Sequence, residues 1–139
     1  MGKALLKQGR DAEAITYFRK ALLLDPNNLD VLIYVARVLA SDENPQVRDG
    51  QTAFVMASKA SALTGGFQPV MLDAVAMAYA ELGRFDDAQK AAQDAVTLAK
   101  DYKMTNDVTV IQQRLELYKN RRPFRQSFTN APSKEPPKN

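Results

Sequence analysis

Few side chains in this sequence are suited to catalysis, and the clearest candidate is the acidic pair Asp86-Asp87. Two adjacent carboxyl groups could act as general acid and base if their pKa values were shifted. The sequence has no His and no Cys, which excludes thiolate nucleophiles, disulfides and Cys/His zinc sites. The pair follows a turn and opens a predicted helix, where acidic residues interact favourably with the helix dipole. We therefore assign it a structural role and expect no enzyme activity, no metal and no cofactor.

Two other motifs could bind charged ligands. Gly65-Gly66 lacks the GxGxxG or GxxxxGK[ST] pattern of a phosphate loop, so we interpret it as a helix terminator. The run KNRRPFR at 119–125 carries one aromatic residue, Phe124, and could contact RNA or an anionic lipid surface. A solvated helix end, or docking of Phe124 onto the last helices, is the favoured interpretation. Nucleic-acid binding through this basic segment is kept as a weaker alternative.

The composition is typical of one globular domain. The chain has 139 residues, of which 45% are hydrophobic and 25% charged, and no apolar run approaches the roughly 18 residues that span a bilayer. The formal net charge is +3, and the basic excess lies in residues 119–139, which carry six Lys or Arg and one Glu. The first residues lack the features of a secretory signal. We expect a cytoplasmic location, or a periplasmic one if a longer parent is membrane-anchored.

An internal repeat is the strongest pattern in the sequence. Ala, Ala and Leu recur with spacings of seven and three residues at Ala14-Ala21-Leu24, Ala53-Ala60-Leu63 and Ala88-Ala95-Leu98. This spacing places the three residues on one face of a helix. Gly9 and Gly83 lie 74 residues apart in equivalent turns, which is two units of about 34 residues plus about six. We place the surplus in SDENPQVRDGQ at 41–51, a longer connection that contains Pro.

These patterns predict an all-α fold of stacked helical hairpins. We expect helices at 1–8, 11–24, 29–41, about 48–63, 69–82, 85–100 and 106–120. The last helix has one apolar stripe of Val108, Ile111, Leu115 and Tyr118, as expected for a helix that closes a solenoid. Residues 121–139 are rich in Pro, Ser, Asn and Lys, and we expect them to form a basic flexible tail.

Two stretches carry a family resemblance. GKALLKQGRDAEAITYFRKALLLDPNN resembles a tetratricopeptide repeat in its Gly, Ala, Tyr/Phe, Ala and Pro landmarks. The stretch from NPQVRDGQ through LDAVAMAYAELGRFDDAQKAAQDAVTLA to RLELYKNRRPFR resembles the C-terminal end of bacterial tetratricopeptide proteins. Some of these are large membrane proteins with a glycosyltransferase-like N-terminal part, and others are soluble.

The resemblance implies a right-handed α-solenoid of about three repeats over residues 1–120. The expected units are a truncated repeat at 1–28, a repeat with a longer loop at 29–68, a repeat at 69–102 and a capping helix at 105–120, followed by the tail at 121–139. The first unit lacks the opening turn of its first helix, so we expect the chain to be a fragment of a longer array.

In this family the first helix of each hairpin lines a concave groove that binds a peptide or a partner domain. Subtracting the inward stripe of each such helix leaves the candidate groove residues. They are Lys3, Lys7, Asp30, Ile33, Tyr34, Arg37, Asp73, Met77 and Glu81. The groove would be basic toward the N-terminal end, apolar in the middle and acidic at Asp73 and Glu81. Alternatively, Tyr34 and Met77 simply pack against neighbouring helices.

The family's known ligand sets are absent at these positions. A carboxylate clamp needs Lys, Asn and Arg on successive first helices, but Tyr34, Arg37, Val70 and Ala74 stand there and only Lys3 matches. An Asn ladder would need Asn in place of Tyr34 and Ala74. The protein or peptide partner is therefore not identified.

Three functional hypotheses follow. The first is a protein-interaction module that binds its partner in the groove. The second is a C-terminal accessory region that recruits substrate to a larger enzyme, such as a glycosyltransferase-like membrane protein. The third, nucleic-acid binding through the tail, is weaker. Self-association through residues 1–24 is a further hypothesis, because a truncated first hairpin leaves an apolar edge uncovered.

Overall fold

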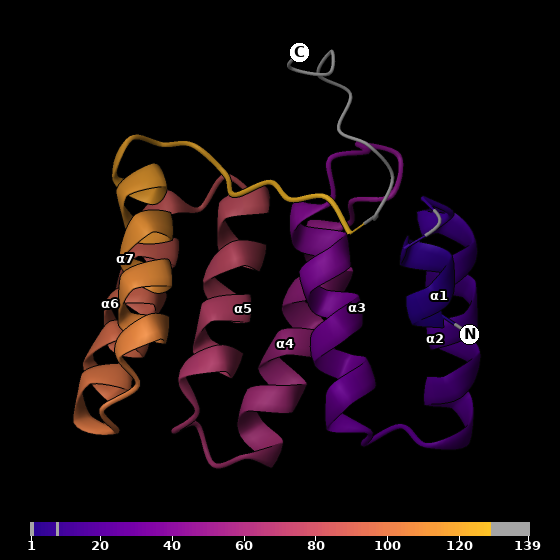
Figure 1. Cartoon of the computed structure of the whole chain (residues 1–139), viewed down its shortest axis with the longest axis horizontal. Coiled ribbons are helices and arrows are strands. Elements are labelled where there is room, and N and C mark those ends of the chain that lie inside the picture. Colours follow the sequence, from indigo (N-terminus) through magenta and orange to yellow (C-terminus); the bar gives the residue numbers. More distant parts are fainter. Residues whose placement is uncertain (1, 8, 129–139) are drawn as a thin grey trace, which may run out of the picture.

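The chain folds into a row of antiparallel helical hairpins (Figure 1). The computed structural model describes residues 2–7 and 9–128, and of residues 6 and 7 only the backbone. Its helices are α1 (Gly2–Lys7), α2 (Asp11–Leu24), α3 (Leu29–Ser41), α4 (Gly50–Leu63), α5 (Pro69–Glu81), α6 (Phe85–Asp101) and α7 (Thr105–Lys119). Each helix begins and ends within two residues of its predicted range. The described residues form no strand, and the predicted all-α solenoid is confirmed.

The helices pair in chain order. α1 packs on α2, α3 on α4 and α5 on α6, while α3 also contacts α5 and α7 contacts both α6 and α5. In Figure 1 the helices α1, α3, α5 and α7 lie toward the viewer, and we call the surface that they form the front face. It corresponds to the groove expected from the sequence. Within the described part of the chain, no helix combines the length and the apolar character needed to cross a membrane.

Local signals set the helix ends. The Asn28 side chain accepts a hydrogen bond from the Val31 N–H at 3.2 Å and caps α3. Asp49 caps α4 in the same way, accepting from the Thr52 N–H at 3.1 Å. Gly83 has a φ of +77° in the turn between α5 and α6, a conformation that costs a glycine little. These caps and turns explain why the predicted boundaries hold.

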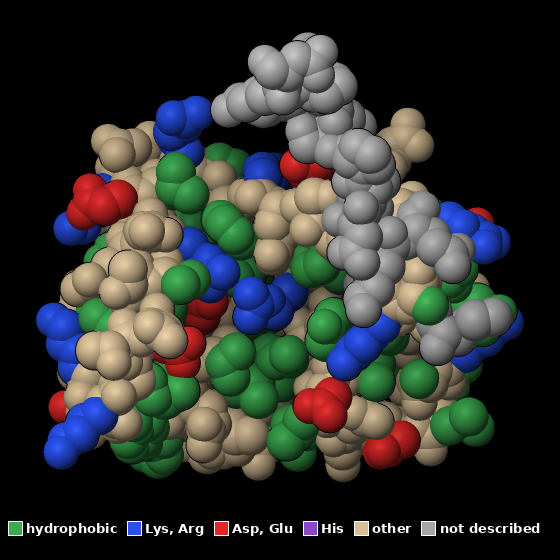
Figure 2. Space-filling view, in the orientation of Figure 1, with side chains coloured by type: hydrophobic (Ala, Val, Ile, Leu, Met, Phe, Trp, Pro, Cys, Tyr) green, Lys and Arg blue, Asp and Glu red, His purple; other side chains and the backbone are tan. Residues whose placement is uncertain are grey.

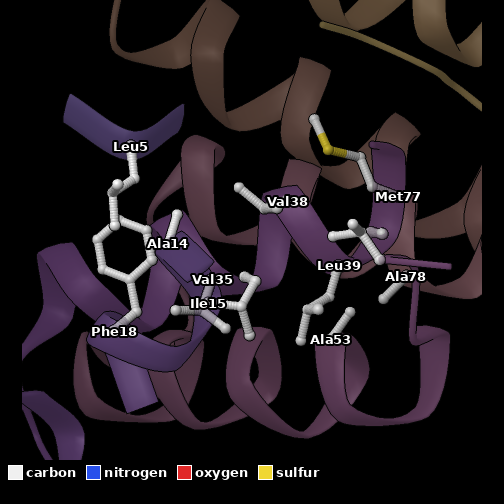
Figure 3. Packing of buried hydrophobic residues seen from close by; sticks show 12 residues of the cluster. Leu5, Ala14, Ile15, Phe18, Val35, Val38, Leu39, Ala53, Met77 and Ala78 are labelled. Atoms are coloured by element: carbon white, nitrogen blue, oxygen red, sulfur yellow. The ribbon is translucent and has the colours of Figure 1, made fainter. Parts of the chain in front are cut away.

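Alanine at the helix contacts lets the hairpins approach closely. Ala14, Ala53 and Ala88, which belong to the three copies of the repeat, are completely buried. Larger side chains fill the space beside them. Figure 3 shows this for the first core cluster, which runs from Leu5 in the first hairpin to Met77 in α5. The hairpins thus share a continuous apolar core.

The chain after α7 turns back across the helices. Arg121 adopts a left-handed φ of +57°, and the Arg122 N–H donates to the Leu117 carbonyl at 2.9 Å, which closes the helix end. Residues 123–128 then cross the ends of α5 and α3 (Figure 1). We predicted a flexible tail from residue 121, but residues 121–128 are in contact with the helices, and residues 129–139 lie outside the described part.

Two carboxyl groups meet where the first hairpin joins the second. Asp11 opens α2 and Asp42 follows α3, and Asp11 lies close enough to Asp42 to raise the pKa of its carboxyl group. Among the described residues the buried atoms Asp11 Oδ1 and Asp42 Oδ2 have no hydrogen-bond partner, and a protonated Asp42 is able to donate to Asp11. Burial, followed by the hydrogen bond to Asp11, raises the pKa of Asp42 to about 7.

This pair makes the stability of the domain depend on pH. Because the folded state raises the pKa of Asp42 above its ordinary value of 3.8, its contribution is greatest at low pH and is lost as the pH rises toward 7. The chain has no His or Cys, so few other groups titrate between pH 5 and 8. We predict that the free energy of unfolding falls by on the order of 2 kcal/mol over this range.

Asp42→Asn should remove most of this pH dependence and stabilise the protein at pH 8. The amide N–H of Asn can donate to Asp11 at any pH, whereas the carboxyl group of Asp42 can donate only when it is protonated. Urea unfolding at pH 5 and pH 8 measures both effects. Asp86→Asn, at an exposed carboxyl group, is the control and should leave the slope unchanged. An equally steep pH dependence in Asp42→Asn would contradict the assignment.

Candidate functional site

The front face carries the candidate binding residues. Figure 2 shows Lys and Arg side chains gathered near the middle of this face, with hydrophobic side chains around them. Within the described part of the chain, no group of three or more acidic residues could hold a metal ion.

The N-terminal half of the front face is open. Lys3 is exposed, and its ammonium group lies 4.3 Å from the centre of the Tyr34 ring, a cation–π contact. Ile33 and Tyr34 are half-buried and Asp30 is exposed. The side chain of Lys7, also predicted here, lies outside the described atoms. Four of the predicted residues thus lie together on α1 and α3.

Arg37 lies on α3 next to this open region. It is half-buried, and its guanidinium makes no hydrogen bond or ion pair with any residue that the structure describes. Burial lowers its pKa, and the nearby Arg114 adds to this effect, whereas the carboxylate of Asp73 opposes it. A partly desolvated guanidinium with unused donors is a binding group for an anion.

The α5 part of the expected groove is closed. Asp73 is 2% exposed and Met77 1% exposed, so neither lies on an open surface as we predicted. Met77 points into the core between α3 and α5, which is the alternative that the sequence left open. Asp73 is covered from α7, where Arg114 forms an ion pair with its carboxylate. The prediction failed because it treated residues 105–120 only as an end cap.

A polar cluster lies under this closed part. Asp73, Arg114 and Tyr118 are buried, and Arg37 interacts electrostatically with all three. Burial raises the pKa of Asp73 against the opposing effect of Arg114. Within the described part, Asp73 Oδ1, Arg114 Nε and the Tyr118 hydroxyl have no hydrogen-bond partner. Asp73 pairs with Arg114, and Arg37 lies near the same carboxylate without an ion pair. The cluster therefore contains two arginines and one carboxylate.

Glu81, the last predicted groove residue, is held by two arginines. Its carboxylate lies 3.2 Å from Arg48 Nε of the longer loop and 2.6 Å from a terminal nitrogen of Arg125. Its side chain is 17% exposed. The acidic end that we expected in the groove is thus neutralised by the protein itself.

Sequence analysis missed Arg114 as part of this face, whereas docking of Phe124 onto the last helices was one of its favoured interpretations. A signal for Arg114 was present, because it lies three residues after Ile111 on the apolar stripe of its helix. A charged residue at such a position requires a buried partner. Phe124 lies under the Arg114 guanidinium, 4.5 Å from its carbon to the ring centre.

Comparison with protein families agrees with this architecture. A family model of the tetratricopeptide repeat matches residues 1–28, which contain α1 and α2, and a second model of the same repeat matches residues 71–102, which contain most of α5 and α6. The chain contains tetratricopeptide repeats at these two segments. Comparisons with curated proteins and with solved structures give no match.

The unit between the two matched segments is also a helical hairpin. It consists of α3 and α4, with a connection at residues 42–49. Arg48 in this connection donates to the main-chain carbonyl of Asp42 at 2.8 Å and pairs with Glu81 of the next hairpin. The longer loop therefore joins two neighbouring helical hairpins.

We predict that Asp73→Ala destabilises the tetratricopeptide domain by about 3 kcal/mol or more, because it leaves Arg114 buried without its counter-charge. Asp86→Ala breaks the exposed pair with Arg121, which are 3.5 Å apart, and should cost about 0–1 kcal/mol. The free energy of unfolding in urea measures both. Equal effects of the two substitutions would contradict the burial argument.

Proposed function

We propose that this tetratricopeptide domain is a protein-interaction module that binds a partner peptide on the open half of its front face, along α1 and α3. Tetratricopeptide repeats support an interaction role in general. The observation that carries the proposal is the half-buried guanidinium of Arg37, which makes no ion pair or hydrogen bond within the described part of the chain.

The charge of the cluster indicates what the ligand supplies. Among the described groups that raise the pKa of Arg37, Asp73 is the one carboxylate. Asp73 already forms an ion pair with Arg114. A carboxylate from a ligand would balance the second arginine and accept two hydrogen bonds from its planar donor group. The proposed ligand therefore presents an Asp or Glu side chain, or a chain terminus, to Arg37.

The neighbouring surface supplies an apolar anchor. Ile33 and Tyr34 are half-buried on α3, and Lys3 reaches over the Tyr34 ring from α1. An aliphatic or aromatic ligand residue beside the carboxylate would pack on these side chains, and such contacts account for much of the affinity at peptide sites. The proposed ligand is a short segment with an apolar residue close to an acidic one.

The basic C-terminal segment is less suited to nucleic acid than its sequence indicated. Phe124, its aromatic residue before position 128, is packed against both large core clusters. Arg125 pairs with Glu81 at 2.6 Å. These side chains would have to leave their contacts before they could stack on a base or bind a phosphate. This supports a peptide ligand on the front face over the nucleic-acid alternative.

The test uses an array of short synthetic peptides that pair Leu or Phe with Asp or Glu, together with matched peptides that carry Asn or Gln. The acidic peptides should bind the wild-type chain, and Arg37→Met should weaken their binding by about tenfold or more, which corresponds to the loss of a charged hydrogen-bonded pair. Tyr34→Ala should weaken acidic and amide peptides alike. Fluorescence anisotropy measures the dissociation constants.

Arg19→Met, at an exposed arginine of α2, is the matched control and should bind like the wild type. Arg37→Met should not lower the urea midpoint, because it removes a poorly solvated cation that has no partner in the free protein. Unchanged binding of the acidic peptides by Arg37→Met would refute the role of Arg37. Unchanged binding by Tyr34→Ala as well would refute the proposed surface.

A further inference from the structure

The segment after α7 lies on the helices in the way that a bound peptide would. Residues 123–128 run in an extended path over the C-terminal ends of α5 and α3, far from the first hairpin in sequence (Figure 1). Pro123 begins the path, and Gln126 forms a parallel bridge with Asp42. The segment is not part of any helix, so its position depends on the contacts that it makes with the surface below.

The end of α3 supplies the main-chain contacts. The last carbonyl groups of a helix have no partner within the helix. Here the Gln126 N–H donates to the Ser41 carbonyl at 2.8 Å, and a terminal nitrogen of Arg125 lies 3.4 Å from the Ala40 carbonyl. The Gln126 side-chain amide also donates to the Ser41 hydroxyl at 2.9 Å. A positively charged Arg125 at this end is favoured by the helix dipole.

The side chains of the segment alternate between an apolar and a charged contact. Phe124 packs against the core clusters on both sides of α5, and Phe128 packs against the first of them. Between them, Arg125 forms its ion pair with Glu81. Two aromatic anchors, one ion pair and main-chain hydrogen bonds are the usual components of peptide recognition.

We infer that a second peptide-binding site is formed by the end of α3, by Glu81 and by the apolar core residues against which Phe124 and Phe128 pack. Residues 124–128 occupy it in cis, and its partner is an extended peptide with an aromatic residue followed by Arg and Gln. This site lies at the loop end of the front face and does not use Arg37 for contact, so its contacts are distinct from those of the acidic-peptide site proposed above.

Covalent attachment explains how residues 124–128 can occupy the site and still be replaced by a free peptide. A short linker holds its segment at an effective concentration on the order of millimolar, so a free peptide with the same contacts competes poorly. The segment belongs to no helix and can open locally without unfolding of the domain. Weakening the segment should therefore make the surface available to a peptide added in trans.

The test uses the full chain with the substitutions Phe124→Ala and Arg125→Ala, which remove one anchor and the ion pair. The probe is a labelled synthetic peptide with the sequence of residues 122–128. The double variant should bind it at least about tenfold more tightly than the wild type, because the competing segment is weakened. Adding Glu81→Gln should reduce this binding, and a scrambled peptide should not bind.

The matched control is the double variant Asn120→Ala with Arg122→Ala, whose side chains are exposed just before the segment. It should bind the probe no better than the wild type. If the first double variant does not fold, Gln126→Pro provides the second measurement, because it removes the N–H that donates to Ser41 and leaves both anchors in place.

Absence of probe binding by a folded, segment-weakened variant would overturn the inference, as would equal binding by the wild type. Dimers that form without added peptide and dissociate when the probe is added, seen by sedimentation, would overturn the assignment of a partner peptide in favour of a second copy of this chain. Binding at Arg37 is measured separately, so failure of one site leaves the other site's result intact.

Discussion

The front face depends on one buried ion pair, between Asp73 of α5 and Arg114 of α7. Removal of two charged groups from water is costly unless they pair, so this contact fixes the position of α7 beside α5. The apolar residues of α7 then pack on α6 and α5, with Tyr118 completely buried. The pair thereby decides which part of the face is closed and which part is open.

An apolar pair of the same volume could close the same surface with equal or greater stability. The charged pair brings a property that an apolar pair lacks, because it sets an electric field at the edge of the open region. Arg37 lies in this field, where Arg114 repels its charge and Asp73 attracts it. The charge of Arg114 therefore affects Arg37, which is the residue proposed to bind an acidic ligand.

The sequence was sufficient for the helices and insufficient for the surface. Helix ends follow from nearby residues such as Asn28 and Gly83, and the hairpins follow from the Ala spacing, so both were predictable from local pattern. The closure of the face rests on contacts between distant positions. Asp73 and Arg114 are 41 residues apart, and Ser41 and Gln126 are 85 apart. No periodicity within one helix contains this information.

The same limit explains the mixed result at the candidate site. Lys3 is exposed and Ile33, Tyr34 and Arg37 are half-buried, so the surface position expected from the core stripe agrees with the structure there, and their role in binding stays a prediction. The residues predicted on α5 are covered by α7 and by the C-terminal segment. A solenoid's terminal elements have no next repeat to pack on, and here they fold onto the face that a repeat pattern leaves exposed.

Arg114 links the two proposed sites physically. Its guanidinium pairs with Asp73 on one side and covers the Phe124 ring of the segment at 4.5 Å on the other. Departure of Phe124 would admit water to Arg114 and weaken its interactions with Asp73 and Arg37, because charges interact less strongly in a more polar medium. With less repulsion from Arg114, Arg37 would gain less from a ligand carboxylate, and its affinity for an acidic ligand would be lower. Since coupling between binding sites is reciprocal, an acidic ligand on Arg37 would in turn favour the docked segment.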